Sequence, residues 1–402
     1  LFFSGKMDFT TEENRMDVVY YAHRWRLEPK DTSAYERGEL VEPTKPIVFY
    51  VDPNFPEKWT KYIYMGIEDW NLAFEKIGFK NAVQARPFPT DDPEFDPDNI
   101  KYSCVRYAPL PVENAMGPSW VDPRTGEILN ASVFIYHNAA SLVYNWRVLQ
   151  TGAVDPRVRG IKLPEDVLGE SIRYVVRHEI GHCCGLMHNM GASSAFPTDS
   201  LRSVTFTQKY GTTPSIMDYA RYNYVAQPGD YEKGVSLTPP ILGPYDYHAI
   251  RWAYQPILEV QTAEEEVPIL DQWVSEKIKD PMYRYGKQQF TWPQYDPRAL
   301  AEDLGDDAMK ASANGIKNLK YVMENINDWV DADDKDYSFR SAIYYSILMQ
   351  YRQYISNVQP IIGGIYLNEK YVGDPFPVYQ SVPKEKQKEA VQFILSAMGD
   401  VE

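Results

Sequence analysis

The sequence is poor in cysteine, with only Cys104, Cys183 and Cys184 among its 402 residues. Three cysteines cannot build a framework of disulfide bonds, which excludes the class of small disulfide-stabilised domains. The sequence also lacks any apolar run of about 18 residues, so we predict no membrane-spanning helix. Basic residues are fewer than acidic ones, 41 against 56, and the net charge is −15. This charge argues against nucleic acid or an anionic membrane as a partner.

The first ten residues, LFFSGKMDFT, lack the basic region, apolar stretch and cleavage site of a signal peptide. Because they also lack an initial Met, we expect the chain to be a processed or excised piece of a longer protein. The composition, 44% hydrophobic and 14% aromatic, is that of a globular protein. The length allows one large domain or two ordinary ones.

Three of the six histidines lie within eleven positions of the segment RHEIGHCCGLMHN, residues 177–189. His178 and His182 are four apart, so on a helix they project from one face. Gly185 can adopt a left-handed conformation that ends the helix, which lets His188 return to the same metal as a third ligand. Three protein ligands leave one position of a tetrahedral zinc ion for water or substrate. The pattern H-E-x-x-H-x-x-G-x-x-H therefore predicts one catalytic Zn²⁺ rather than a structural ion.

Glu179 follows the first histidine, where its carboxylate can contact a water on the metal without binding the metal itself. It is the candidate general base. Cys183 and Cys184 lie in the same predicted helix. Because the histidines already supply a complete ligand set, we expect these two cysteines to be small buried side chains rather than metal thiolates.

Strands and helices are predicted to alternate in the first half of the chain. The segment PIVFYVDPNFPEKW (46–59) predicts a strand, a turn at residues 52–54 and a helix from Pro56 to about Gly78. Further strands are predicted at 82–86, 100–108 and 128–136, and a strand–helix–strand unit of this kind suggests a mixed sheet. The apolar residues of the helix recur at spacings of three and four: Trp59, Ile63, Ile67, Trp70 and Phe74.

The first two histidines are predicted to lie near the end of a long helix over 162–185. Its predicted buried face consists of Leu168, Ile172, Val175, Val176 and Ile180. Beyond about residue 256 the pattern becomes mainly helical, with helices predicted at 299–330, 338–358 and 383–398.

Two acidic segments and one apolar stripe have plain structural interpretations. The segment 89–99 lacks EF-hand spacing, which favours a solvated loop over a calcium site. The acidic residues of 302–310 are predicted to complement a helix N-terminus rather than bind metal. We expect helix–helix packing, rather than a cofactor site, from Tyr344, Ile347, Leu348 and Tyr351.

A second signature, TPSIMDYARYNY (213–224), follows the histidines. Together with the eleven-residue motif it resembles the metzincin metalloproteases, in which a tight turn carries a methionine beneath the metal. Met217 matches that methionine, in a segment similar to S-x-M-x-Y. Tyr219 matches the tyrosine that approaches the zinc and can hydrogen-bond the transition state. Asp218 departs from the histidine often found between them, and the alternative is an ordinary turn with a buried methionine.

Longer stretches resemble the large secreted bacterial zinc-dependent metalloproteases that carry a Met-zincin domain. These stretches are WRLEPKD (25–31), GELVEPTKPIVFYVDP (38–53), GIEDWNLAFEKIGFKNA (66–82), VDPRTGEIL (121–129), HNMGASSAFPTDSLRS (188–203), IMDYARYNYVAQPGD (216–230), GPYDYHAI (243–250) and EDLGDDAMKAS (302–312). The resemblance implies an α+β fold: a metzincin-like catalytic domain over 1–255, with a twisted mixed sheet and the active-site helix, and a helical subdomain over 256–402 packed on it. It also implies a secreted, periplasmic or cell-surface protein.

By the same analogy, the strand at 128–136 would be the sheet edge beside the active-site cleft. An extended peptide could add to that edge as a further strand. His137, at the end of this strand, could be a fourth neighbour of the metal, but the complete ligand set favours a surface histidine.

The residues and the resemblance together predict a zinc-dependent endopeptidase that acts on peptide or protein substrates. Zinc would lower the pKa of water from about 15.7 to about 7. Glu179 would take the proton of that water and pass it to the leaving amine, and Tyr219 would donate to the developing oxyanion.

Three rival interpretations remain open. A gluzincin-type protease would use a glutamate as third ligand, although Gly185 and His188 favour the histidine. A non-catalytic peptide-binding or adhesion protein could retain a metal site, although the presence of Glu179 argues against a decayed one. The third rival is a metal-dependent hydrolase that acts on a non-peptide amide.

Overall fold

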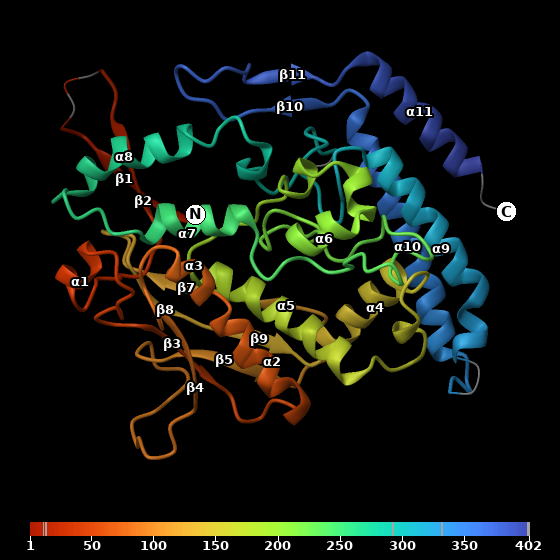
Figure 1. The fold of residues 1–402 in the computed structure, drawn as a ribbon, viewed down its shortest axis with the longest axis horizontal. Helices are drawn as coiled ribbons and strands as arrows, with labels where there is room; N and C mark the ends of the chain where they lie inside the picture. Colours follow the sequence, from red (N-terminus) through yellow and green to blue (C-terminus); the bar gives the residue numbers. More distant parts are fainter. Residues whose placement is uncertain (11, 13, 292, 331–332, 400–402) are drawn as a thin grey trace. The chain divides into compact units, whose positions relative to one another are not determined.

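A computed structural model describes the chain except residues 11, 13, 292, 331–332 and 400–402 (Figure 1). The chain forms two compact units. Unit 1 contains Leu1–Leu142, Gly169–Met187 and Asp246–Asp271, and unit 2 contains Val143–Leu168, His188–Tyr245 and Gln272–Glu402. The division into 1–255 and 256–402 stays a prediction about domains.

Unit 1 carries the sheets of the first half of the chain and most of three longer helices. Its strands are β1 (Phe3–Asp8), β2 (Asp17–Ala22), β3 (Ile47–Val51), β4 (Val83–Pro87), β5 (Ser103–Ala108), β6 (Ala115–Met116), β7 (Ser119–Val121), β8 (Ile128–Ala131) and β9 (Val133–Tyr136). Its helices are α1 (Thr32–Glu36), α2 (Glu57–Glu68), α3 (Asn71–Glu75) and most of α5 (Glu165–Cys183), α7 (Pro244–Tyr254) and α8 (Ala263–Ser275).

The central sheet of unit 1 is mixed, in the order β4-β3-β5-β9-β6. Neighbours among β4, β3, β5 and β9 are parallel, whereas β6 is antiparallel to β9. This mixed sheet among many helices confirms the predicted α+β class. β1 and β2 form a separate hairpin, and β7 pairs with β8.

The prediction that 128–136 is one strand at the sheet edge is wrong. The segment is split at Ser132 into β8 and β9, and β8 belongs to a different sheet. Ala115 and Met116 of β6 pair with Ile135 and Phe134, so β6 takes the edge position. Two residues give no alternating pattern, which is why this short strand was not predicted.

The predicted helix from Pro56 to Gly78 is present as two helices, α2 and α3. All five residues of its apolar face are buried, as predicted: Trp59, Ile63, Ile67, Trp70 and Phe74. The interruption between the helices falls at Asp69 and Trp70, and both side chains form hydrogen bonds to residues of α5.

Asp69 and Trp70 hold the helix α5. The Trp70 indole donates to the carbonyl of Arg177 at 2.9 Å. The Asp69 carboxylate accepts from Arg173 at 2.6 and 2.8 Å and from Arg177 at 3.0 Å. Asp69 and Arg177 are buried, so their charges lose hydration when the protein folds. The charge-assisted hydrogen bonds of this cluster offset that desolvation cost. The contacts fix α5 one residue before His178.

Unit 2 is mainly helical. It contains most of α4 (Ala139–Thr151), the helices α6 (Val204–Tyr210), α9 (Ala308–Val330), α10 (Ser338–Val358) and α11 (Lys384–Gly399), and the hairpin of β10 (Ile365–Leu367) and β11 (Tyr379–Ser381). Short 3₁₀ turns occur at Pro156–Val158, Ser193–Ala195, Thr198–Arg202, Pro281–Tyr283 and Gln359–Ile361. Figure 1 shows α9 and α10 side by side.

The helix predictions for this unit are confirmed in type but not in every bound. α10 and α11 match the predicted 338–358 and 383–398 closely. The helix predicted from 299 begins only at Ala308, because Gly305 has a φ of +77° and interrupts a helical path. Asp307 caps α9 by accepting from the backbone of Lys310 at 3.0 Å, as predicted for this acidic segment.

The predicted apolar stripe of α10 is only half buried. Ile347 is 5% exposed, whereas Tyr344 is 50% and Leu348 43% exposed. Packing against α9 therefore uses a narrower face of α10 than the sequence suggested. The acidic segment 89–99 is a loop of turns and bends, and its residues are exposed or half-buried. Among the described residues, no helix is both long and apolar enough to cross a membrane.

Candidate metal centre

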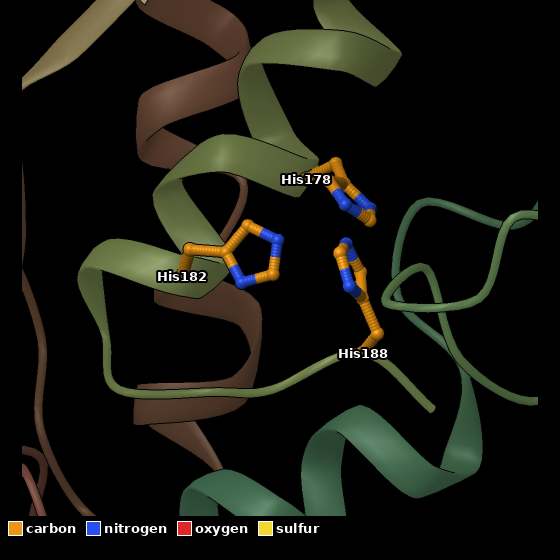
Figure 2. Close-up of side chains that lie close together, drawn as sticks. All are labelled: His178, His182 and His188. Atoms are coloured by element: carbon orange, nitrogen blue, oxygen red, sulfur yellow. The ribbon is translucent and has the colours of Figure 1, made fainter. Parts of the chain in front are cut away.

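Three imidazole rings meet at the end of α5. His178 and His182 project from successive turns of the helix, and His188 returns from the loop that follows (Figure 2). One ligand nitrogen from each lies within 4.8 Å of the other two. In the part of the chain that the structure describes, this is the one group of three or more potential ligand side chains. No glutamate belongs to it, so the described residues give no support for a gluzincin-type ligand set.

Gly185 makes the turn that brings His188 back. Its φ is +86°, and a Cβ at this position would lie 2.2 Å from the carbonyl oxygen of His23. A side chain is therefore excluded both by backbone conformation and by space. The turn also brings Leu186 to the helix end, where its backbone N–H donates to the carbonyl of Gly181 at 3.1 Å.

The carbonyl groups at the end of α5 receive donors from outside the helix. The Trp25 indole donates to Cys183 O, the Tyr254 hydroxyl to Cys184 O, and the Phe2 N–H to Gly185 O, each at 2.8 Å. These bonds satisfy carbonyls that a helix end leaves open. They hold the turn between the second and third histidines in one conformation.

Hydrogen bonds at Nδ1 orient two of the rings. His182 Nδ1 lies 2.8 Å from the carbonyl oxygen of Leu186, and His188 Nδ1 lies 2.9 Å from Gln288 Oε1. Since these oxygens accept, each Nδ1 carries the proton and each Nε2 is left as the metal ligand. Burial lowers the pKa of His188, which favours the neutral form that a metal requires.

These observations fit a zinc ion. Three neutral imidazoles are a donor set that zinc accepts at about 2.0–2.1 Å, with a fourth position left open. The nitrogens span at most 4.8 Å, so small side-chain adjustments bring all three to one ion. The residues present can therefore hold the metal that the motif predicts.

Both predicted packing cysteines are buried thiols. Cys183 and Cys184 are 0% exposed and free. Burial raises the pKa of Cys184 to about 12 and that of Cys183 well above its usual value. Neither belongs to the histidine group, and neither is poised to be a thiolate.

Glu179 lies on α5 beside His178 and is 8% exposed. The chain leaving β6 passes directly against this residue. A Cβ built on Gly117 would lie 2.6 Å from the carbonyl oxygen of Glu179 and 3.2 Å from Cys183 Sγ. Only a glycine allows the chain this close to α5, and sequence patterns gave no signal for it.

Met217 lies in a buried turn and is 1% exposed. Its carbonyl accepts from the backbone N–H of Asn189 at 3.0 Å, which links the turn to the residue after His188. Asp218, 0% exposed, accepts from the backbone N–H of Ser193 at 2.7 Å. The aspartate that departs from the usual histidine therefore points into the protein and ties the turn to the 193 segment.

The Tyr219 ring lies against the third ligand. Its centroid is 4.5 Å from that of the His188 ring, at an interplanar angle of 62°. Arg221 lies over Tyr219, with its guanidinium carbon 4.0 Å from the ring centroid. The same carbon is 3.9 Å from the centroid of Trp146, and Arg221 Nε lies 3.5 Å from Glu302. Sequence reasoning missed Gln288 and the contacts of Arg221 with Trp146 and Glu302, since these contacts join distant parts of the chain.

A family model described as Met-zincin matches residues 160–401, more than half of the chain. The chain belongs to the Met-zincin family. This membership supports a metzincin-type zinc metalloprotease and fits the metzincin-like fold predicted from the sequence. Comparisons with curated proteins and with solved structures gave no significant match. Zinc as cofactor, and peptides or proteins as the substrate class, follow from the family and the three histidines of this Met-zincin chain.

His137 is a surface histidine, as predicted. It is exposed, and its Nδ1 lies 2.7 Å from the Tyr107 hydroxyl. Its ring stacks on Trp59 with centroids 5.8 Å apart. It takes no part in the histidine group of the Met-zincin site.

Proposed function

We propose that this Met-zincin protein is a zinc-dependent endopeptidase in which Glu179 is the general base. The observation that carries the proposal is the convergence of His178, His182 and His188 within 4.8 Å at the end of the helix that also carries Glu179. Family membership supports the same conclusion.

The chain's own residues would divide the chemistry between them. A zinc ion, when bound, supplies a Lewis acid that lowers the pKa of water and polarises the scissile carbonyl. Glu179 takes the proton of the attacking water and gives it to the leaving amine. Tyr219, whose ring packs on His188, donates a hydrogen bond from its hydroxyl to the developing oxyanion.

The sheet edge suggests how a peptide binds. β6 is the outermost strand of the central sheet, and the residue after it, Gly117, lies against Glu179 O. An extended peptide that pairs with β6 through main-chain hydrogen bonds would run beside the general base. This assigns the role that the sequence analysis gave to 128–136 to β6.

The principal alternative is a peptide-binding or adhesion protein that retains its metal without catalysis. The test is incubation of the zinc-loaded protein with a mixed peptide library, with and without a chelator, and detection of products by mass spectrometry. We expect new termini that disappear with the chelator. Metal-dependent peptide binding without cleavage would favour this alternative. Hydrolysis of non-peptide amides without any peptide cleavage would favour a metal-dependent amide hydrolase.

A Glu179→Gln variant tests the general base. It should bind zinc as the parent does and cleave no peptide, because the amide cannot take the proton. Glu170→Gln is the matched control, since Glu170 lies on the same helix, is exposed and pairs with Arg173 at 3.3 Å. Continued cleavage by Glu179→Gln, or an equal loss in Glu170→Gln, would contradict the proposed role.

We further propose that the protein acts outside the cytoplasm, as a secreted, periplasmic or cell-surface enzyme. The support is the resemblance to secreted bacterial metalloproteases. Fractionation of the source cells followed by immunodetection tests it, and recovery in the cytoplasm alone would reject it.

A further inference from the structure

The third histidine is held differently from the other two. His178 and His182 are fixed by α5, whereas His188 lies on a loop beyond the Gly185 turn. Its Nδ1 lies 2.9 Å from Oε1 of Gln288, a side chain 100 positions further along the chain. We propose that Gln288 is a positioning residue that accepts the His188 Nδ1 proton and so presents Nε2 to the metal.

The segment that carries Gln288 is joined to the residues that follow His188. The Asn189 side chain donates to the carbonyl of Arg284 at 2.9 Å and accepts from the N–H of Gly286 at 2.8 Å. Gly191 donates to the carbonyl of Gly286 at 3.2 Å. Asn189 is 0% exposed, so these bonds are protected from water. The ligand and its acceptor therefore lie on two segments held in fixed register.

A comparison with His182 shows what the hydrogen bond between His188 and Gln288 contributes. Its Nδ1 donates to the carbonyl of Leu186, only four positions away, so the helix and its own turn orient this ring. For His188 the acceptor at Nδ1 is the side chain of Gln288, 100 positions further along the chain. A side chain fixes the tautomer and plane of the third ligand, and substitution can remove it without changing the ligand.

This arrangement gives the later part of the chain a role at the metal. Residues 284–288 lie within the part that the sequence analysis treated as a helical subdomain, yet they complete the surroundings of His188. The inference rests on the proposed function insofar as it assumes that the three histidines bind zinc. It predicts that zinc affinity depends on a residue that touches neither metal nor substrate.

Substitution of an outer-shell partner of a histidine ligand typically lowers metal affinity about 10–100-fold. We expect Gln288→Leu, which keeps the volume but removes the acceptor, to weaken zinc binding by about that factor. Gln288→Glu retains an oxygen acceptor in the same position, so its zinc affinity should lie within about threefold of the parent. Lys287→Ala is the matched control, because this exposed neighbour pairs with Glu369 at 3.3 Å and should leave zinc binding unchanged.

The experiment is a competition titration of the metal-free protein with zinc and a chelator of known affinity. Thermal unfolding of each metal-free variant, recorded in parallel, separates positioning from folding. Weak zinc binding by Gln288→Leu, restored in Gln288→Glu, with equal unfolding temperatures without metal, supports the proposal. Parental affinity in Gln288→Leu, equal losses in both variants, or a loss matched by Lys287→Ala overturns it.

Peptidase activity and the positioning role of Gln288 can be tested separately. If the parent binds zinc and Gln288→Leu weakens binding, but no peptide is cleaved, the proposed function fails and the positioning role stands. If the parent cleaves peptides and Gln288→Leu binds zinc normally, the positioning role alone fails. A parent that binds no zinc overturns both.

Discussion

Arg221 lies with its guanidinium carbon 4.0 Å from the centroid of the Tyr219 ring and 3.9 Å from that of Trp146. Its backbone has a φ of +54°, which for a residue other than glycine costs about 1–2 kcal/mol. Strain of this kind is retained where the surrounding structure holds it, often at functional sites. The strained backbone places a cation over the ring that packs on His188. We therefore expect Arg221 to affect catalysis through the position of Tyr219.

Arg221→Asn should lower kcat/KM about tenfold, the size expected from losing a partly desolvated cation–π contact. Asparagine tolerates positive φ, so the backbone conformation is preserved.

Tyr219→Phe should lower activity about 10²–10³-fold with zinc retained, as loss of an oxyanion donor does. In the Tyr219→Phe background, Arg221→Asn should have a much smaller effect. Kinetics of the four proteins measure this coupling, and equal effects in both backgrounds would contradict a role through Tyr219.

The features of the centre that were predicted correctly depend on short-range rules. The spacing of His178 and His182 and the positive φ of Gly185 each follow from a local pattern, whereas the turn with the buried Met217 was predicted from the resemblance to S-x-M-x-Y. Helical periodicity likewise predicted α2, α5 and α10, because an amphipathic pattern needs only its own sequence to be recognised.

The features that were missed join parts of the chain that are distant in sequence. Gln288 meets His188 across 100 residues, and Gly117 meets the carbonyl of Glu179 through a close backbone approach. A glutamine or a glycine in a loop has many structural uses, and its partner is set only by the folded arrangement. The two-residue strand β6 could not be predicted for the same reason, since only its pairing with β9 makes it a strand.

Asp69→Ala should destabilise the fold strongly. The carboxylate is 8% exposed and is the shared acceptor of Arg173 and of the buried Arg177. Removing one partner leaves buried charge uncompensated, at a cost of about 3–5 kcal/mol in the free energy of unfolding. Urea unfolding of the metal-free protein measures it. Glu39→Ala, which breaks an exposed pair with Arg37, is the control and should change little. Equal stability of the two variants would show that Asp69 does not hold α5.

The raised pKa of Asp218 predicts that the free energy of unfolding falls as pH rises. Burial raises the pKa of Asp218 to about 7, and burial together with Asp218 raises the pKa of Asp303 as well. An unfolded aspartate has a pKa of about 3.9. The folded state thus holds protons that the unfolded state releases above pH 4. Its stabilisation is full below that pH and is lost as pH rises through about 7.

The Asp218→Asn variant isolates this effect, because the asparagine side chain does not titrate. The stability of the parent relative to the variant should fall by up to about 4 kcal/mol between pH 4 and pH 8, from a shift of about three pKa units. Chemical unfolding of both metal-free proteins across this range measures it, and the histidines cancel in the difference. Asp91→Asn, in the exposed loop, is the control and should show no such trend. A parent-minus-variant difference that is constant with pH would reject a buried protonated pair.

Gly117→Ala tests the contact between the sheet edge and the helix that carries Glu179. The added Cβ would lie 2.6 Å from Glu179 O, closer than any ordinary contact, so either β6 or α5 must move. Overpacking of this kind costs about 1–3 kcal/mol, and a displacement of about 1 Å near the reacting groups can cost 10²-fold in rate. We therefore expect a lower unfolding temperature and a lower kcat/KM. Leu129→Ala, at a side chain of β8 that is 48% exposed, is the control and should leave kcat close to that of the parent. If Gly117→Ala kept both the parental kcat and KM, activity would not depend on the close approach of this segment to Glu179. That result would contradict the proposed pairing of a peptide with β6.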